Sequence, residues 1–429
     1  MLISLLKPFF ALIVIASVFY YFLSLYCTRK FFQKGRKTSS GFASPSLRSG
    51  SLPPVTVLKP LNGLEKGLYE NLLSHLQQDY PACQVIFGVR NLDDPAVSVV
   101  ERLKKELPEK DIELVVSDKI IGSNLKISNL NNMYQRAKYG VIVINDADTR
   151  VRPDYLKRVV APFEDDQVGG TTCVYRTLDS FSFASAIEAF FINGDFLPSV
   201  LVANYLGMQF GLGATIAVRR KVLDEIGGFV ALANYLADDY EIGNRIIRAG
   251  YKLHLCDYLV DVVLQEAGLR EYLRHNVRWA RTIRSCRPSG YFLRIFTRGT
   301  PFSIAFLIIT DFSTWGLALF FVHLFSRVLT STIIEVVYLK DTKTLSHLLL
   351  LPVKDFITFI VWCWGFAGNK VVWGKNTFYL LEGGKIVMAG PEPERFRAGG
   401  GAVISGPMPA VGSDPATRHE KGFTQSIEY

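Results

Sequence analysis

Apolar stretches near both ends of the chain enclose a region with the pattern of a water-soluble domain. Residues Leu2 to Cys27 are almost wholly apolar and aromatic, and this run exceeds the roughly 20 residues that a helix needs to cross a bilayer. Farther along, Phe302–Val328 and Leu345–Phe366 are again apolar and long enough to span. We therefore predict a transmembrane helix at residues 1–28 and two or three more within residues 300–370, with Thr330–Leu339 as part of a third crossing.

A basic cluster follows the first apolar run directly and consists of Arg29, Lys30, Lys34, Arg36 and Lys37. The positive-inside rule places such a cluster in the cytoplasm. A secretory signal peptide is the competing interpretation, but the run is too long and no small-residue cleavage site precedes the cluster. We assign residues 29–53 to a basic juxtamembrane linker, in which Thr38–Ser51 is rich in Ser and Gly.

Between Pro54 and about Tyr291, short apolar runs alternate with stretches of helical spacing. The runs typical of strands are Val55–Leu58, Gln84–Val89, Ile112–Val116 and Val141–Ile144. The stretches with helical spacing between them are Leu68–Gln77, Ala96–Glu106 and Ser128–Ala137. This alternation predicts an α/β domain at residues 54–295, with a parallel sheet and helices on both faces. In such sheets ligands bind beyond the carboxyl ends of the strands.

Composition and charge narrow the class of protein. The 429 residues are 49% hydrophobic and carry a net charge of +9. The basic residues gather beside apolar stretches, which favours a membrane surface over a nucleic acid as their partner. Past Met388 the chain is dominated by Gly, Pro, Ala and Ser, so we predict a disordered tail at residues 389–429. This leaves residues 371–388 as a short cytoplasmic segment.

The clearest candidate site follows the run Val141–Ile144, where Asp146 and Asp148 stand one residue apart. Alternate residues of an extended chain point the same way, so both carboxylates can face one spot. Such a pair suits a hard divalent cation that bridges the two phosphates of a nucleotide-sugar. A solvated loop is the alternative, because Asp and Asn are common turn formers.

A second acidic pair, Asp93 and Asp94, follows the run Gln84–Val89. One of these carboxylates could accept a hydrogen bond from a uracil N–H at the edge of the sheet. The spacing fits equally well with an Asp that caps a helix beginning near Pro95.

A third acidic site, Asp238 and Asp239, leads into the helical stretch Ile242–Arg248. An Asp at a helix start can again be only a cap. However, the small residues of Gly211–Thr215 come shortly before it and permit close backbone approach to a ligand.

A fourth site is His275-Asn-Val-Arg278-Trp279, within a segment dense in arginine. Arg274, Arg278 and Arg281 share one helical face. Such a face close to a membrane segment can neutralise a leaving diphosphate or rest on anionic lipid headgroups. Nucleic-acid binding is the weakest option, because no nucleic-acid-binding signature accompanies the segment.

The four sites, in this order, resemble the D, D(xD), D, (Q/R)xxRW series of membrane-bound family 2-like glycosyltransferases. More narrowly, five motifs are similar to those of the ceramide glucosyltransferase family, family 21: Leu58-Lys-Pro-Leu61, Gln78-Asp-Tyr-Pro81, Asp93-Asp-Pro-Ala96, Gly122-Ser-Asn124-Leu-Lys126 and Ala237-Asp-Asp-Tyr240. Three further segments most resemble its bacterial hopanoid-biosynthesis-associated members: Phe191-Ile-Asn193, Phe196-Leu-Pro-Ser199 and His275–Arg284. The resemblance covers roughly Pro54 to Gly290. One residue departs from it, because His275 stands where most members have Gln or Arg; Arg274 is a candidate substitute.

The resemblance implies a GT-A fold and an inverting, UDP-sugar-dependent hexosyltransferase. By this likeness Asp94 would hold the uridine, and Asp146 and Asp148 would hold the diphosphate through Mn²⁺ or Mg²⁺. Asp239 would be the catalytic base, because an inverting transfer needs a carboxylate that removes the proton of the acceptor hydroxyl. Arg278 would stabilise the departing UDP. The remaining residues implied on the donor side are Lys126, Trp279 and, more weakly, Asn124.

The sequence says least about the identity of the acceptor substrate. The resemblance favours a hopanoid-type membrane lipid that receives N-acetylglucosamine, and ceramide that receives glucose is the alternative. No single residue decides between them, because acceptor pockets are apolar and tuned by shape. Two other classes stay open: a polysaccharide synthase, which usually needs a larger membrane channel, and a non-catalytic membrane scaffold. In every case we expect a multi-pass protein of the inner (cytoplasmic) membrane with its α/β domain in the cytoplasm.

Overall fold

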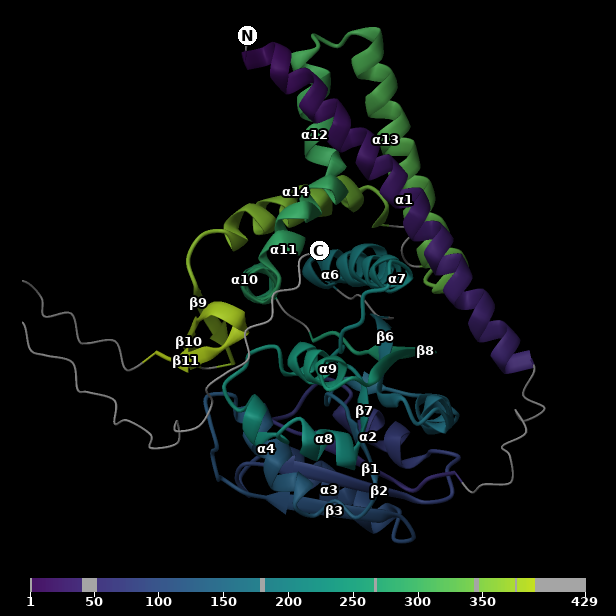
Figure 1. Cartoon of the computed structure of the whole chain (residues 1–429), viewed down its shortest axis with the longest axis vertical. Coiled ribbons are helices and arrows are strands. Elements are labelled where there is room, and N and C mark those ends of the chain that lie inside the picture. The colour runs from purple at the N-terminus through teal and green to yellow at the C-terminus, as the bar shows by residue number, and fades with distance from the viewer. Residues whose placement is uncertain are drawn as a thin grey trace, which may run out of the picture. The chain divides into compact units, whose positions relative to one another are not determined.

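An eight-stranded sheet forms the core of the α/β domain, in the lower part of Figure 1, with the strand order β3-β2-β1-β4-β7-β6-β8-β5. The computed structural model describes residues 2–40, 52–177, 182–265, 268–342, 347–374 and 376–389. The predicted disordered tail, apart from residue 389, and most of the predicted Ser- and Gly-rich linker lie outside these ranges.

The first four strands agree with the runs predicted from the sequence. They are β1 (Val55–Pro60), β2 (Cys83–Val89), β3 (Asp111–Val116) and β4 (Val141–Ile144). All pair in parallel, with β1 between β2 and β4. The predicted α/β class is therefore confirmed, and the carboxyl ends of these strands meet at one edge.

The prediction of a purely parallel sheet was wrong for the other half. The remaining strands are β5 (Thr149–Arg150), β6 (Val168–Thr177), β7 (Ile216–Arg219) and β8 (Lys252–Val262). Strand β7 is antiparallel to both β4 and β6, β8 is parallel to β6, and β5 is antiparallel to β8. An apolar run indicates that a strand exists but not its direction, because direction depends on how the intervening segment returns to the sheet.

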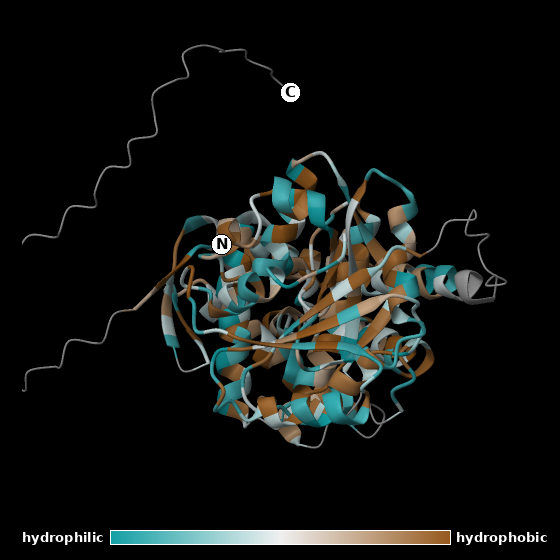
Figure 2. Ribbon diagram, turned by 90° about the horizontal axis from the view of Figure 1, so that it is seen from below, coloured by the Kyte–Doolittle hydropathy of each residue, from teal (hydrophilic) through white to brown (hydrophobic). Residues whose placement is uncertain are grey.

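Helices cover both faces of the sheet. One core gathers the side chains of α2 (Leu68–Leu76), α3 (Ala96–Glu106) and α5 (Tyr155–Val160). The other gathers those of α4 (Leu125–Tyr134), α8 (Arg220–Glu225) and α9 (Asp238–Arg248). Successive side chains of a strand point to opposite faces, so Val57 packs in the first core and Leu58 in the second. Figure 2 shows the hydrophobic residues concentrated along the strands.

The apolar helices gather on one side of this domain. They are α1 (Leu2–Ser40), α6 (Phe183–Phe191), α7 (Leu197–Tyr205), α12 (Gly299–Ile309), α13 (Thr314–Thr332) and α14 (Leu350–Gly365). Helices α1, α12 and α13 lie side by side and project away from the sheet (Figure 1). Within the described ranges, the helices long and apolar enough to cross a membrane are Leu5–Gly35, Phe183–Tyr205 and Thr314–Tyr338, with a bent fourth at Pro288–Ile309.

The C-terminal apolar region differs from its sequence prediction. A single span over Phe302–Val328 was expected, but the chain reverses between α12 and α13, where Asp311 and Phe312 adopt positive φ. Ser313 then caps α13 by accepting a hydrogen bond from the Gly316 amide at 3.2 Å. The proposed third crossing at Thr330–Leu339 is instead the π-helical continuation of α13, η5 (Ile333–Tyr338).

Two other segments were not recognised as ordered elements from the sequence. Residues Phe183–Tyr205 form α6 and α7, joined by the π-helical turn η2 (Ile192–Phe196), and about two thirds of the most apolar part is buried inside the protein. Acidic residues interrupt the apolar run of this segment, so its sequence pattern did not indicate a long apolar helix. The expected short segment at 371–388 folds as a small antiparallel sheet of β9 (Lys370–Trp373), β10 (Asn376–Leu380) and β11 (Ile386–Met388).

Candidate active site

The Asp146–Asp148 turn lies at the carboxyl end of β4 and rests on buried polar groups. The side chain of Asn145 is fully buried, and its Nδ2, which has two hydrogens to donate, lies within hydrogen-bond distance of three acceptors: the Tyr155 hydroxyl at 2.8 Å, the Ala214 carbonyl at 2.8 Å and the Thr215 hydroxyl at 2.9 Å. The buried side-chain ammonium of Lys59 donates a hydrogen bond to the backbone carbonyl of Asp146 at 2.8 Å. These bonds fix the turn, so the two Asp side chains leave the strand end in a set direction.

The carboxylates at this edge repel one another. Burial, Asp146 and Glu65 raise the pKa of Asp148 to about 8. Glu65 follows β1, and one of its oxygens, Oε2, is buried with no hydrogen-bond partner among the described residues. Burial lowers the pKa of the nearby Lys59 to about 7, although Asp148 and Asp146 oppose this. The carboxylates of Asp146, Asp148 and Glu65 therefore crowd this edge, and their proximity favours the protonated form of Asp148.

This excess of acceptor oxygens fits a divalent cation that is shared with a substrate. Among the residues that the structure describes, no group of three or more His, Cys, Asp or Glu side chains could hold a metal ion alone. Mg²⁺ is commonly bound by one or two carboxylates together with substrate phosphates and water. Asp146 and Asp148 fit that arrangement, with the remaining ligands supplied by a diphosphate.

Lys126, near the start of α4, links this edge to the third acidic site. Its ammonium lies 2.7 Å from Asp146 Oδ1 and 3.1 Å from Asp238 Oδ2, and its side chain is 19% exposed. Burial alone would lower the pKa of Lys126, but Asp146 and Asp238 raise it above its usual value. Asn124 caps α4 by accepting a hydrogen bond from the Ile127 amide at 3.0 Å. Asn124 therefore has a structural role that orients Lys126.

Asp239, in the first turn of α9, approaches Asp146 across Gly213. A Cβ atom placed on Gly213 would lie 3.2 Å from Asp146 Oδ2 and 3.2 Å from Asp239 Oδ2. A Cβ on Gly211 would overlap the Asp239 carbonyl oxygen. The small residues Gly211 and Gly213 let α9 bring its carboxylate to the strand edge, while the close approach to a ligand that the sequence suggested for Gly211–Thr215 stays a prediction. Burial and Asp238 raise the pKa of Asp239 to about 6.

We expect Gly213→Ala to reduce activity about tenfold, because misplacing reacting groups by a fraction of an ångström is costly. The added methyl group would press on both carboxylates and occupy the space between them. Gly140→Ala is the matched control, since a Cβ there meets no atom within 4 Å. Initial rates with equal amounts of folded protein check this. Equal activity of the two variants would show that the space beside Gly213 is not used.

Arg278 and Trp279 lie on α10 (Leu269–Cys286) and point to different surroundings. Burial lowers the pKa of Arg278 to about 10, and the negative charges of Asp239 and Asp238 oppose this. The Trp279 ring instead packs on Phe191 and Phe196, with ring centroids 6.3 and 5.8 Å away. Arg278 therefore interacts electrostatically with the acidic residues, whereas Trp279 packs among aromatic rings.

An aromatic row connects the acidic residues with α6. The pKa of the Tyr175 hydroxyl is raised, first by burial and next by the negative charge of Asp239. The Tyr175 ring packs on Phe196 at 4.8 Å, and Trp279 continues the row to His275 at 5.0 Å. His275 Nδ1 in turn lies 3.1 Å from Glu188 Oε1 on α6. The residue that departs from the family pattern therefore has a carboxylate partner.

The hydrogen bonds of Asp94 fit the alternative interpretation of its motif, in which an Asp caps the helix that begins near Pro95. Its carboxylate accepts hydrogen bonds from the Ala96 amide at 2.9 Å, at the start of α3, and from the Gly63 amide at 3.1 Å. An ionised carboxylate has further lone pairs that can accept a hydrogen bond from a ligand. Asp94 as a nucleotide-binding residue stays a prediction.

Two residues at this edge were missed from the sequence, Lys59 and Glu65. Lys59 entered the sequence analysis only as part of the motif Leu58-Lys-Pro-Leu61, and Glu65 lies in the loop that follows. The signal that would have found them is that Lys59 lies near the end of β1 and Glu65 follows it, because the carboxyl end of β1 meets that of β4.

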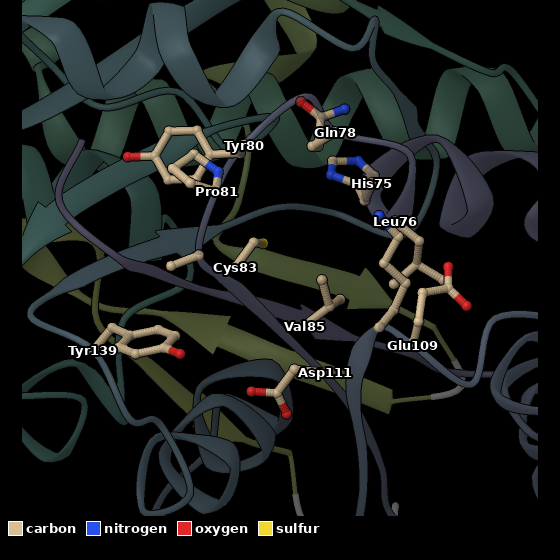
Figure 3. A pocket seen from close by; sticks show the side chains of 12 residues that line it. His75, Leu76, Gln78, Tyr80, Pro81, Cys83, Val85, Glu109, Asp111 and Tyr139 are labelled. Atoms are coloured by element: carbon tan, nitrogen blue, oxygen red, sulfur yellow. The ribbon is translucent and has the colours of Figure 1, made fainter. Parts of the chain in front are cut away.

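A cavity of about 320 Å³ opens at the opposite edge of the sheet. Figure 3 shows it beside Cys83, Asp111 and Tyr139, which lie at the amino ends of β2, β3 and β4. None of the predicted site residues lines it. The chemistry-bearing groups therefore gather at the carboxyl edge and not at this cavity.

Comparisons with known proteins indicate the family of the chain. The chain matches the family described as glycosyl transferase family 21 over residues 9–386. It is similar to ceramide glucosyltransferase 1 of Caenorhabditis elegans, with 29% identity over 47% of this chain and 44% of the relative. Ceramide glucosyltransferase 3 of the same organism is 26% identical over 56% of this chain and 55% of the relative. These matches span about half the length of the curated relatives.

Among solved structures, the chain is similar to a mannosyltransferase from Pyrobaculum calidifontis in complex with GDP-Man and Mn²⁺. The identity is 18%, the match covers 84% of this chain and 99% of that chain, and the TM-score is 0.45.

Proposed function

The chain belongs to glycosyl transferase family 21, and we propose that it transfers one sugar from a UDP-sugar to a hydroxyl group of a membrane lipid, with inversion at the anomeric carbon. Its mixed α/β sheet is of the GT-A type expected for this family. The observation that carries the proposal is the convergence of Asp146 and Asp239 beside Gly213, since it brings a donor-side and an acceptor-side carboxylate to one spot.

Asp239 is the residue best suited to be the base. With a pKa raised to about 6 it is largely ionised at neutral pH, and yet it is a stronger base than an ordinary Asp. In the proposed step it accepts the proton of the lipid hydroxyl while the hydroxyl oxygen attacks the anomeric carbon. The bond between that carbon and the UDP oxygen then breaks, and UDP leaves with the electron pair.

Positive charge near this spot suits a diphosphate leaving group. Lys126 lies between Asp146 and Asp238, and Arg278 lies near Asp238 and Asp239. Charged donors that are already in place stabilise charge that develops in the transition state. A cation held by Asp146 and Asp148 would neutralise further charge on the diphosphate.

The apolar helices support a lipid as the acceptor. Within the part of the chain that the structure describes, three helices, or four with the bent pair, are long and apolar enough to cross a membrane, and a soluble acceptor would not require them. We propose a hopanoid-type lipid that receives N-acetylglucosamine, and ceramide that receives glucose is the alternative. The curated relatives are described as ceramide glucosyltransferases, which supports the alternative directly.

Expression in a host that makes neither lipid product tests the acceptor. Cells receive a hopanoid or ceramide together with labelled UDP-glucose or UDP-N-acetylglucosamine after permeabilisation, and lipid extracts are examined by mass spectrometry. We expect one added sugar on one of the lipids. Label found only in a water-soluble polymer would support a polysaccharide synthase and overturn the lipid acceptor.

We further propose that the α/β domain faces the cytoplasm at the inner membrane, on the basis of the basic cluster Arg29–Lys37. A protease-cleavable tag inserted after Ser51 reports this orientation. Cleavage by external protease on intact cells would contradict it.

A further inference from the structure

The small sheet β9–β11, which follows the last apolar helix, binds the segment just before the acidic pair of α9. The Leu236 amide donates to the Gly384 carbonyl at 3.0 Å, and the Ile386 amide donates to the Asn234 carbonyl at 2.7 Å. The Leu236 side chain is buried in a cluster with Val371, Phe378, Leu380 and Ile386. Only one residue separates Leu236 from Asp238, so this contact fixes where α9 begins.

The same sheet is attached to α10, which carries Arg278. The Ser285 hydroxyl donates to the Leu381 carbonyl at 2.7 Å and accepts from the Gly384 amide at 3.1 Å. Arg284 donates to the Gly368 carbonyl at 2.8 Å, just before β9. The sheet therefore joins two elements of the candidate site that are distant in the sequence.

Trp373, the last residue of β9, reaches the site itself. The guanidinium carbon of Arg278 lies 6.0 Å from the centroid of the Trp373 ring, within the range of a cation–π interaction. Asp239 and Asp238 also attract the Arg278 guanidinium, since both oppose the fall in its pKa that burial causes. An arginine has many rotamers, and ordering its side chain costs free energy. Packing against the Trp373 ring restricts those rotamers before any ligand binds.

We infer that β9–β11 is part of the active site and that Trp373 is a positioning residue, which holds Arg278 where the diphosphate of UDP binds. The inference rests on the proposed function, because it assigns Arg278 to the leaving group. Trp373 itself is not assigned a contact with the substrate.

A double-mutant cycle on UDP affinity tests this without turnover. UDP is titrated, in the presence of MnCl₂, into detergent-solubilised full-length protein carrying Trp373→Leu, Arg278→Ala, or both. A cation–π interaction of ordinary strength predicts that Trp373→Leu weakens UDP binding about three- to tenfold. In the Arg278→Ala background the same substitution should change the affinity by less than about twofold, because coupled residues are not additive.

Two further variants separate positioning from folding. Trp373→Phe keeps an aromatic face and should retain UDP affinity within about twofold. Val387→Ala removes an exposed side chain of β11 and should leave affinity unchanged. Melting temperatures of all variants show whether the small sheet stays folded.

The outcomes distinguish this inference from the proposed function. If the wild type binds UDP but Trp373→Leu weakens binding equally with and without Arg278, Trp373 does not act through Arg278 and the inference is wrong. Equal affinity of Trp373→Leu and Trp373→Phe would contradict it as well. If the wild type itself does not bind UDP, the proposed function fails instead.

Discussion

Replacing Asp239 with Asn is expected to reduce kcat about 10³-fold or more while the affinity for UDP changes little. A positioned general base typically contributes 10²- to 10⁴-fold, and Asn cannot accept the proton. The substitution keeps the shape of the side chain, so α9 and the segment that β11 holds should remain in place. Steady-state kinetics together with UDP titration separates the two effects. Asp166→Asn, at a fully exposed acidic residue, is the control that should keep full activity.

The pH profile gives a second measure of the same residue. Since burial and Asp238 raise the pKa of Asp239 to about 6, protonation should remove the base as the pH falls through 6. An ordinary Asp would titrate near pH 4 (about 3.9). An acid limb of kcat/KM near pH 4, or an Asp239→Asn variant with more than about a tenth of wild-type activity, would rule out Asp239 as the base.

Asp146→Asn and Asp148→Asn are expected to lower activity about 10²-fold each, because a bound cation typically contributes several kcal/mol of charge stabilisation. Chelator should abolish wild-type activity, and Mn²⁺ or Mg²⁺ should restore it. The raised pKa of Asp148 implies that the metal-free site holds a proton near neutral pH, so metal binding should release protons into a weakly buffered solution.

UDP affinity provides a readout of this site other than activity. In the wild type it should rise when Mn²⁺ is added, and this difference should shrink in both Asp variants. Full activity of both variants would end the assignment of a metal to this turn.

The sequence predicted the first half of the sheet well because its strands are continuous apolar runs, as in β4 and its neighbour β1. The second half depends on chain direction, and β7 reverses it through pairing with β4 that no local pattern reveals. Similarly, Phe302–Val328 is apolar throughout, but two positive-φ residues and the cap at Ser313 turn the chain inside it. Hydropathy measures what can be buried and not where the backbone reverses.

The candidate site was predictable in part. Residues after parallel strands meet at one edge, which pointed to Asp146 and Asp148 from spacing alone. Arg278 lies on a helix beyond the sheet, so helical spacing indicated a basic face there but left its partner open between a diphosphate and lipid headgroups. Glu65 and Lys59 were not identified because no local pattern distinguishes either residue. Trp373 lies 95 positions beyond Arg278, so only the folded chain reveals the contact between them.

The central claim is that this edge of the sheet moves a sugar from UDP to a lipid hydroxyl. The direct measurement uses purified full-length protein in lipid vesicles with UDP-sugar and the lipid that the expression test identifies. Released UDP and glycosylated lipid are quantified in the same samples. We predict one glycolipid for each UDP released, and neither product with Asp239→Asn. Release of UDP without glycolipid, or equal glycolipid from Asp239→Asn, would contradict the account.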